Sequence, residues 1–234
     1  SDVSINNLFG GYVTMVPSSL TEIDIIGDCE VIADNHFAGL GNLEIVRLPS
    51  GVKEIGNNAF YGCARLVEVT NINEVKTIGN SAFYGCNNFD FDNTNTFTNV
   101  NYVGYNAFSG TKFMVSSTEE FVMINNVLVK YNGKSKKVVL PENVVSIAGG
   151  TFSANLSLEE LTLSENTKLI CTGAFDSCSN LELITIQGST FVEIEINVFD
   201  TISNKFEVVL DEDLISIYKG DIYWSLCEGH LIGK

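Results

Sequence analysis

Apolar residues recur along this chain at a nearly constant spacing, with polar residues between them. A phenylalanine marks each copy, with separations of 23, 23, 25, 44, 23 and 24 residues: Phe37, Phe60, Phe83, Phe108, Phe152, Phe175 and Phe199. Five positions earlier lies a β-branched residue: Ile32, Ile55, Ile78, Val103, Ile147, Ile170 and Ile194. A unit this short cannot enclose a core alone, whereas stacked copies bury each other's apolar side chains. The pattern therefore predicts a solenoid with its phenylalanines in a column.

Each clear copy contains a segment that alternates as a β-strand with one buried face. LEIVRL (43–48), LEELTL (158–163) and LELITI (181–186) fit the pattern L-x-x-L-x-L. A shorter extended piece, such as VKEI (52–55), precedes a glycine, and NNAFYGC (57–63) is too short for a regular helix and predicts a helical turn or tight bend. Because the strands repeat once per coil, we expect them to lie parallel in one continuous sheet.

Other segments depart from the period. Residues 114–141 consist of extended pieces joined at Asn125-Asn126 and Asn132-Gly133, and Asn-Gly is a strong signal for a hairpin turn. Residues 90–99 have the composition of an inserted polar loop. Residues 211–234 are aromatic and partly helical in pattern, as expected of the cap that the end of a solenoid needs.

These segments define the predicted domain organisation. We expect one domain over residues 1–234, with repeat blocks at 29–113 and 144–210, a hairpin interruption at 114–141 and a cap at 211–234. Residues 20–25 match only the strand half of a repeat. We therefore expect the chain to be part of a longer array.

Composition and charge exclude several classes of function. The 234 residues are 45% hydrophobic, too apolar for an intrinsically disordered chain. The formal net charge of −16 argues against binding nucleic acid, whose phosphates require clustered Lys and Arg, and against an anionic membrane surface. No apolar run approaches the roughly 18 residues of a membrane-spanning helix, so we expect a soluble chain with no membrane insertion.

The repeats resemble the BspA-type leucine-rich repeat, whose signature is V-x-x-I-G-x-x-A-F-x-G-C-x-x-L-x-x-V. VKEIGNNAFYGCARLVEV (52–69) and VKTIGNSAFYGC (75–86) match it almost residue for residue, and the tail around Tyr223-Trp224 is similar to the segment that closes such arrays. The resemblance implies a right-handed leucine-rich-repeat solenoid, of the α/β class but mostly β. It also implies an adhesion or interaction module of a surface or secreted protein of a host-associated microbe. Glu195 at the glycine position departs from the signature.

Six cysteines raise the question of disulfides or metal binding. Cys63, Cys86 and Cys178 share one repeat position, and stacking would bring Cys63 and Cys86 within about 5 Å, near disulfide range. Cys178 faces Asn155 in the preceding copy, so the position does not encode a bridge. We predict free, buried thiols that behave as small hydrophobes. With no C-x-x-C pair and two histidines far apart in sequence, no zinc site is predicted.

The segment 90–96 spaces oxygen-bearing side chains two apart, as a calcium loop does. Its sixth position is Asn95 in place of glycine, and its twelfth is Asn101 in place of glutamate. A solvated loop is therefore favoured over a calcium site. The chain also lacks a G-x-S-x-G, P-loop, H-E-x-x-H or G-x-G-x-x-G pattern, so we predict no enzyme activity, no cofactor and no bound metal.

The outward positions of the predicted strands are the candidate partner-binding residues. One row across the coils contains Glu22, Ile45, Glu68, Glu160, Leu183 and Val208. The neighbouring row contains Asp24, Arg47, Thr70, Thr162 and Thr185. Because regular coils present a broad rigid surface, a sheet face with acidic and apolar patches suits binding. The alternative is that these positions only keep the sheet soluble.

The leading hypothesis is a non-enzymatic binding or adhesion module that recognises a protein or glycan through its sheet face or edge loops. One alternative is a structural spacer that projects another domain from the cell surface, and another is a repeat domain attached to an enzyme. We expect a monomer. We recognise no signal peptide at Ser1 and no sorting tail after Lys234, and we expect the sequence to be a trimmed segment of a longer protein. An extracellular or cell-surface location therefore rests on the resemblance.

Overall fold

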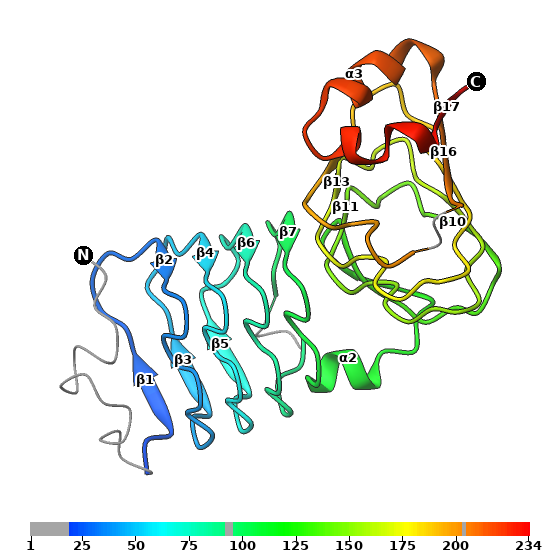
Figure 1. Ribbon diagram of the computed structural model, residues 1–234. Coiled ribbons are helices and arrows are strands. Elements are labelled where there is room, and N and C mark those ends of the chain that lie inside the picture. Colours follow the sequence, from blue (N-terminus) through cyan, green and yellow to red (C-terminus); the bar gives the residue numbers. More distant parts are fainter. Residues whose placement is uncertain (1–18, 92–95, 203–204) are drawn as a thin grey trace. The chain divides into compact units, whose positions relative to one another are not determined.

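The computed structural model of the chain describes residues 19–91, 96–202 and 205–234 (Figure 1). It divides into two compact units, Ser1–Ser117 and Thr118–Lys234. Each unit is built from short coils whose strands stack in parallel sheets. The boundary between the units falls inside the segment that the sequence predicts to interrupt the repeats.

In the first unit the coils supply strands to two separate parallel sheets. One sheet contains β1 (Glu22–Asp24), β3 (Ile45–Arg47) and β5 (Glu68–Thr70). The other contains β2 (Val31–Ile32), β4 (Glu54–Ile55), β6 (Thr77–Ile78) and β7 (Tyr102–Val103). The short helix α2 (Lys112–Ser116) follows. The predicted parallel-sheet solenoid is confirmed. The prediction of one continuous sheet is wrong, because the strands of the two units belong to different sheets and the shorter extended pieces form a second sheet in each unit.

The second unit repeats this arrangement. One sheet contains β10 (Lys137–Val139), β12 (Glu160–Thr162), β14 (Leu183–Thr185), β16 (Glu207–Leu210) and β17 (Leu231–Gly233). The other contains β9 (Val127–Tyr131), β11 (Ser146–Ile147), β13 (Leu169–Ile170) and β15 (Glu193–Ile194), with β8 (Phe121–Ile124) added antiparallel to β9 at its edge. The predicted hairpin is therefore present, and its second strand also serves as a strand of the parallel sheet.

The hairpin turn lies at Asn125-Asn126, where Asn125 has a φ of 51°. The Asn132-Gly133 pair, the stronger signal by sequence, forms no hairpin, and neither residue has a positive φ. A Cβ on Gly133 would lie 2.2 Å from the Tyr131 hydroxyl oxygen. A side chain at this position would therefore displace the end of the Tyr131 ring, and the chain then continues to β10 in the other sheet.

A column of aromatic rings fills the core of each unit. In the first unit the ring centroids of Phe37, Phe60, Phe83 and Phe108 are 5.0, 5.0 and 5.2 Å apart. In the second unit those of Tyr131, Phe152, Phe175 and Phe199 are 5.2, 5.6 and 6.1 Å apart. The predicted stacking of the phenylalanines is present within each unit, and Tyr131 takes the phenylalanine's place in the altered coil.

The C-terminal segment covers the end of the second column. It contains η2 (Glu212–Leu214), α3 (Ile215–Gly220) and η3 (Trp224–His230) before β17. Tyr218 and Trp224 are fully buried, and the Trp224 ring centroid lies 5.4 Å from that of Phe199. The Trp224 indole nitrogen donates a 2.7 Å hydrogen bond to the Val192 carbonyl. These contacts attach the segment to the last coil, where the sequence predicts a cap.

Candidate partner-binding surface

Strand register brings the predicted candidate residues together in two separate sheets. In the first unit, Glu22 pairs with Ile45 and Ile45 with Glu68, which defines row 1. In the second unit, Glu160 pairs with Leu183, and Leu183 pairs with Glu207, which defines row 2. Every side chain of both rows is partly or fully exposed. Each row therefore places an apolar side chain between two carboxylates on neighbouring strands.

The companion positions also lie in register. In the first unit Asp24, Arg47 and Thr70 are aligned. In the second unit Thr162 and Thr185 are aligned, and Val209 continues the line. The prediction that Val208 belongs to row 2 is wrong, because Val208 is fully buried and pairs with the core residue Ile184. The last copy has its apolar residues one position late, and this shift moves Glu207 into the row.

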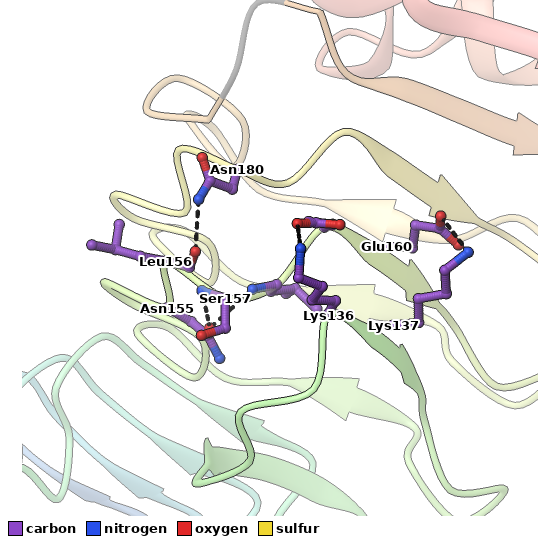
Figure 2. Close-up of polar contacts among 9 residues, drawn as sticks. Lys136, Lys137, Asn155, Leu156, Ser157, Glu160 and Asn180 are labelled. Carbon is purple, nitrogen blue, oxygen red and sulfur yellow. Dashed lines mark hydrogen bonds and ion pairs between the residues drawn. The ribbon is translucent and has the colours of Figure 1, made fainter.

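Cationic side chains neutralise one end of each row. Arg47 lies 2.9 Å from a carboxylate oxygen of Glu22 and 3.0 Å from one of Asp24. These hydrogen bonds, the one to Asp24 foremost, raise the pKa of the Arg47 guanidinium. In the second unit, Lys137 Nζ lies 2.7 Å from Glu160 (Figure 2). Because each pair joins adjacent strands, the ion pairs connect neighbouring coils.

The same face carries a second inter-coil ion pair beside row 2. Lys136 Nζ lies 2.6 Å from Glu159, which raises the pKa of the lysine through this hydrogen bond (Figure 2). Asn180 also donates a 2.7 Å hydrogen bond to the Leu156 carbonyl of the preceding coil. These contacts hold the coils of the second unit in a fixed register on the side of β12 and β14.

The other end of each row remains unneutralised. In the described part of the chain, neither Glu68 nor Glu207 forms an ion pair with Lys or Arg. Ile45 and Leu183, their apolar neighbours, are half-buried. With strands about 4.8 Å apart, the two carboxylates of a row lie on the order of 10 Å apart with an apolar side chain between them. This arrangement can contact a partner through one charged and one apolar group at once.

The cysteine position is an inter-coil hydrogen-bond site. The Sγ atoms of Cys63 and Cys86 donate to the carbonyls of Phe37 and Phe60, 3.1 and 3.0 Å away in the preceding coil. All six cysteines are free. Burial raises the pKa of Cys63 to about 12 and also raises that of Cys86. Such thiols are poor nucleophiles and poor metal ligands, because both roles require the thiolate.

Most of the candidate calcium loop lies outside the described residues. Asp90 is described, and one of its oxygens accepts a 2.9 Å hydrogen bond from the Phe91 amide while the other lies 3.0 Å from Lys112 Nζ. Within the ranges that the structure describes, no group of three or more His, Cys, Asp or Glu residues is placed to hold a metal ion. None of the helices described is long and apolar enough to cross a membrane.

One surface feature of the first unit was not predicted from the sequence. Tyr61 and Tyr84 are 44% and 39% exposed, and their rings stack with centroids 5.1 Å apart and planes 6° apart. Both directly follow the core phenylalanine in the two most similar repeats. That shared position is the signal that could have identified the pair.

Two parallel sheets per stack, buried aromatic columns and in-register surface rows define a β-solenoid repeat protein. The family model described as BspA type leucine rich repeat region, with six copies, matches residues 14–126 and 122–225. The chain belongs to this family. The resemblance of residues 52–69 and 75–86 to the repeat signature is thereby confirmed.

Similar solved structures are also leucine-rich repeat proteins. One from Bacteroides ovatus is 18% identical over 81% of this chain, with a TM-score of 0.41, and the match spans 63% of that protein's length. One from T. pallidum is 19% identical, covers 87% of this chain and 85% of its own, and has a TM-score of 0.32. One from Eubacterium ventriosum is 17% identical over 82% and 74%, with a TM-score of 0.39. No curated protein matches the chain.

Proposed function

We propose that the chain is a non-enzymatic binding module of a cell-surface or secreted protein, which recognises a protein or glycan partner through the faces that carry rows 1 and 2. The observation that supports this proposal is the recurrence of one surface pattern in both units. Glu22–Ile45–Glu68 and Glu160–Leu183–Glu207 each place an apolar side chain between a neutralised and an unneutralised carboxylate. Membership of the BspA-type family supports the surface location and the binding role.

The second sheet of each unit supplies matched controls for a test. We would replace Glu68 and Glu207 with lysine, and compare them with Glu54→Lys in β4 and Glu193→Lys in β15. Both control residues are exposed, and neither forms an ion pair with Lys or Arg in the described residues. The four variants change net charge equally on two different faces. A difference between them therefore reports the position of the charge and not the total charge.

The measurement is binding of the chain to immobilised extracellular matrix proteins and to a glycan array. We expect at least one interaction to weaken tenfold or more in Glu68→Lys or Glu207→Lys and to stay within twofold in the controls. An equal loss of binding in the test variants and the control variants would contradict the assignment of the binding surface. Monomeric behaviour is checked on the same samples by light scattering.

The second candidate function is a spacer that projects another domain. The observation that favours it is the use of Arg47, Lys136 and Lys137 in ion pairs between coils, which stiffen a stack without leaving those charges for a partner. If the unmodified chain binds no matrix protein or glycan above background, the spacer replaces the binding module.

A further inference from the structure

The last coil of the second unit and the C-terminal segment border an open-sided hollow of about 130 Å³. Phe199 and Phe206 line it from the coil side, and Tyr223 and His230 line it from the C-terminal segment. The Phe199 ring is the last of the aromatic column and is only partly covered. A solenoid end exposes its final apolar layer unless a cap covers it. Here Phe206 and Trp224 lie against Phe199 at centroid distances of 5.2 and 5.4 Å, His230 stacks on Phe206 at 4.3 Å, and the remaining exposed part of these rings borders the hollow.

Two carboxylates also line this hollow. Glu195 replaces the repeat glycine, and one of its oxygens accepts a 2.7 Å hydrogen bond from the Thr172 amide. Asp200 follows Phe199 and is exposed. In the part of the chain that the structure describes, neither carboxylate is paired with Lys or Arg, and neither cation type lines the hollow. The site therefore combines aromatic faces with uncompensated negative charge.

We propose that this hollow binds a primary alkylammonium group, as carried by the side chain of a lysine on a partner protein or by a free amine. Aromatic faces and carboxylates both attract an organic cation, through cation–π attraction and charge-assisted hydrogen bonds. An anion would be repelled by Glu195, Asp200 and the net charge of −16. A neutral apolar molecule would leave the two carboxylates unused.

The size of the hollow restricts the ligand further. A cavity of about 150 Å³ accommodates benzene, which has six heavy atoms. The hollow of about 130 Å³ therefore has room for four methylenes and an ammonium group. This inference rests on the proposed binding function, and it names a chemical group that the partner would present to the second unit.

The single tryptophan of the chain reports on this site. Trp224 lies in η3, its ring centroid is 5.4 Å from that of Phe199, and it is one residue from Tyr223. We would titrate the full chain with n-butylammonium chloride and with the neutral analogue n-pentanol. Binding would be followed by Trp224 fluorescence and by backbone amide shifts in NMR spectra. We expect a Kd of about 1 mM for the amine, at least tenfold tighter than for the alcohol, with shifts centred on residues 194–200.

Two variants test the carboxylates. Glu195→Gln with Asp200→Asn removes both charges, and the glutamine can still accept from the Thr172 amide, so we expect about tenfold weaker amine binding without unfolding. Glu193→Gln, two residues away in β15 and not part of the hollow, is the matched control and should bind as the unmodified chain does. Equal binding of pentanol and amine, unchanged affinity in the double variant, or shifts that map elsewhere would each overturn the proposal.

A third titration separates the two sources of the amine. Acetyl-Gly-Lys-Gly-amide should bind as tightly as n-butylammonium if the site takes a lysine of a partner protein. Binding of n-butylammonium without the peptide identifies a free amine instead. Failure of amine binding alongside intact, row-dependent adhesion would overturn this inference and leave the proposed function standing.

Discussion

The two units differ in how they satisfy one backbone amide of the coil. In the first unit, the amide three residues before the core phenylalanine donates to a side chain of the preceding coil. Asn57 donates to Asp34, and Asn80 donates to Asn57, at 2.7 and 2.8 Å. In the second unit, the equivalent amide of Thr172 donates to Glu195 of the following coil. The same backbone donor is satisfied from opposite directions along the stack.

The difference shows that glycine and the Asn or Asp side chain depend on each other. A Cβ on Gly79 would lie 2.6 Å from the Asn57 amide nitrogen and 2.9 Å from its side-chain oxygen. The second unit has Ala148, Cys171 and Glu195 at the glycine position, and no Asn or Asp three residues before its phenylalanines. Its rings are also more widely spaced, at up to 6.1 Å compared with 5.2 Å in the first unit. We infer that the glycine permits the closer approach of neighbouring coils.

The largest expected effect comes from removing a ring from either column. Phe60 and Phe175 are both fully buried, so each change to alanine should cost about 3–5 kcal/mol of unfolding free energy. We expect the larger loss for Phe60→Ala, because its ring has neighbours at 5.0 Å on both sides. Phe175 has neighbours at 5.6 and 6.1 Å. Urea unfolding followed by circular dichroism measures both changes.

Trp224 fluorescence shows whether the two units unfold separately. The tryptophan belongs to the second unit, so its transition should move in Phe175→Ala and stay in place in Phe60→Ala. Repeat proteins are stabilised by contacts between neighbouring coils, which makes such partial unfolding expected. An equal shift of the Trp224 transition in both variants would instead show that the two units unfold together in one cooperative step.

The next largest effect concerns the glycine that lies four residues before the core phenylalanine in the first unit, as at Gly79, and is absent from that position in the second unit. Gly79→Ala places a methyl group against the backbone of Asn57, and we expect a loss of about 1–3 kcal/mol from overpacking. The reverse change in the second unit, Ala148→Gly, should cost about 1–2 kcal/mol, because it removes a buried methyl group and adds backbone freedom to the unfolded chain. Urea midpoints at constant m-value give both numbers. A tolerated Gly79→Ala would show that the glycine does not set the coil spacing.

Much of the fold was predictable because the apolar residues keep the same positions within each repeat. The stacked phenylalanines and the L-x-x-L-x-L strands follow directly from these fixed positions. The second sheet was not predicted as a sheet, because strands of two residues, such as β4 and β6, are too short to show alternation. The position of the hairpin turn was ambiguous because both Asn125-Asn126 and Asn132-Gly133 have residues typical of turns, and only Asn125 adopts a positive φ.

The candidate surface was predictable only in part. Its rows follow from the repeat length, which sets the strand register, and the one-residue shift near Phe206 caused the error at Val208. Lys137 lies in a coil without the repeat signature, so its ion pair with Glu160 has no sequence signal. The hollow beside Phe199 depends on how η3 packs against the last coil, which no periodicity encodes.

A smaller, pH-dependent effect should come from the buried thiols of both units. Burial raises the pKa of Cys63 from 9.0 to about 12 and that of Cys178 to about 11. The folded state therefore holds these protons more tightly. As the pH rises above 9.0, the unfolded state loses them first, and stability falls until the folded pKa is reached. At pH 10 we expect a loss of about 1 kcal/mol for each such thiol.

The thiol effect is isolated by a difference measurement. Thr111 occupies the cysteine position in another coil, so Cys63→Thr with Cys86→Thr is the appropriate variant. Other groups that ionise near pH 10 contribute equally to both proteins and cancel. The unmodified chain should lose more stability than the variant between pH 8 and pH 10 in the transition of the first unit. Parallel pH profiles would mean that the thiols remain solvated.

The smallest effect tests backbone strain two residues after the core phenylalanine. The first unit has glycine there, with Gly62 at a φ of 71°, whereas the second unit has Ala154 at 58° and Ser177 at 60°. A residue with a Cβ is disfavoured in this left-handed conformation, and glycine is not. A Cβ on Gly62 would meet no atom closer than 4.0 Å, so its cost is conformational alone.

Ala154→Gly should therefore stabilise the second unit by about 0.5–1 kcal/mol, and Gly62→Ala should destabilise the first by a similar amount. Ser153→Gly is the matched control, because Ser153 is an exposed neighbour without a positive φ. Glycine there only adds freedom to the unfolded chain and should lower stability. The two opposite signs at adjacent residues identify strain as the cause. If Ala154→Gly lowers the urea midpoint as Ser153→Gly does, the second unit carries no strain at this turn.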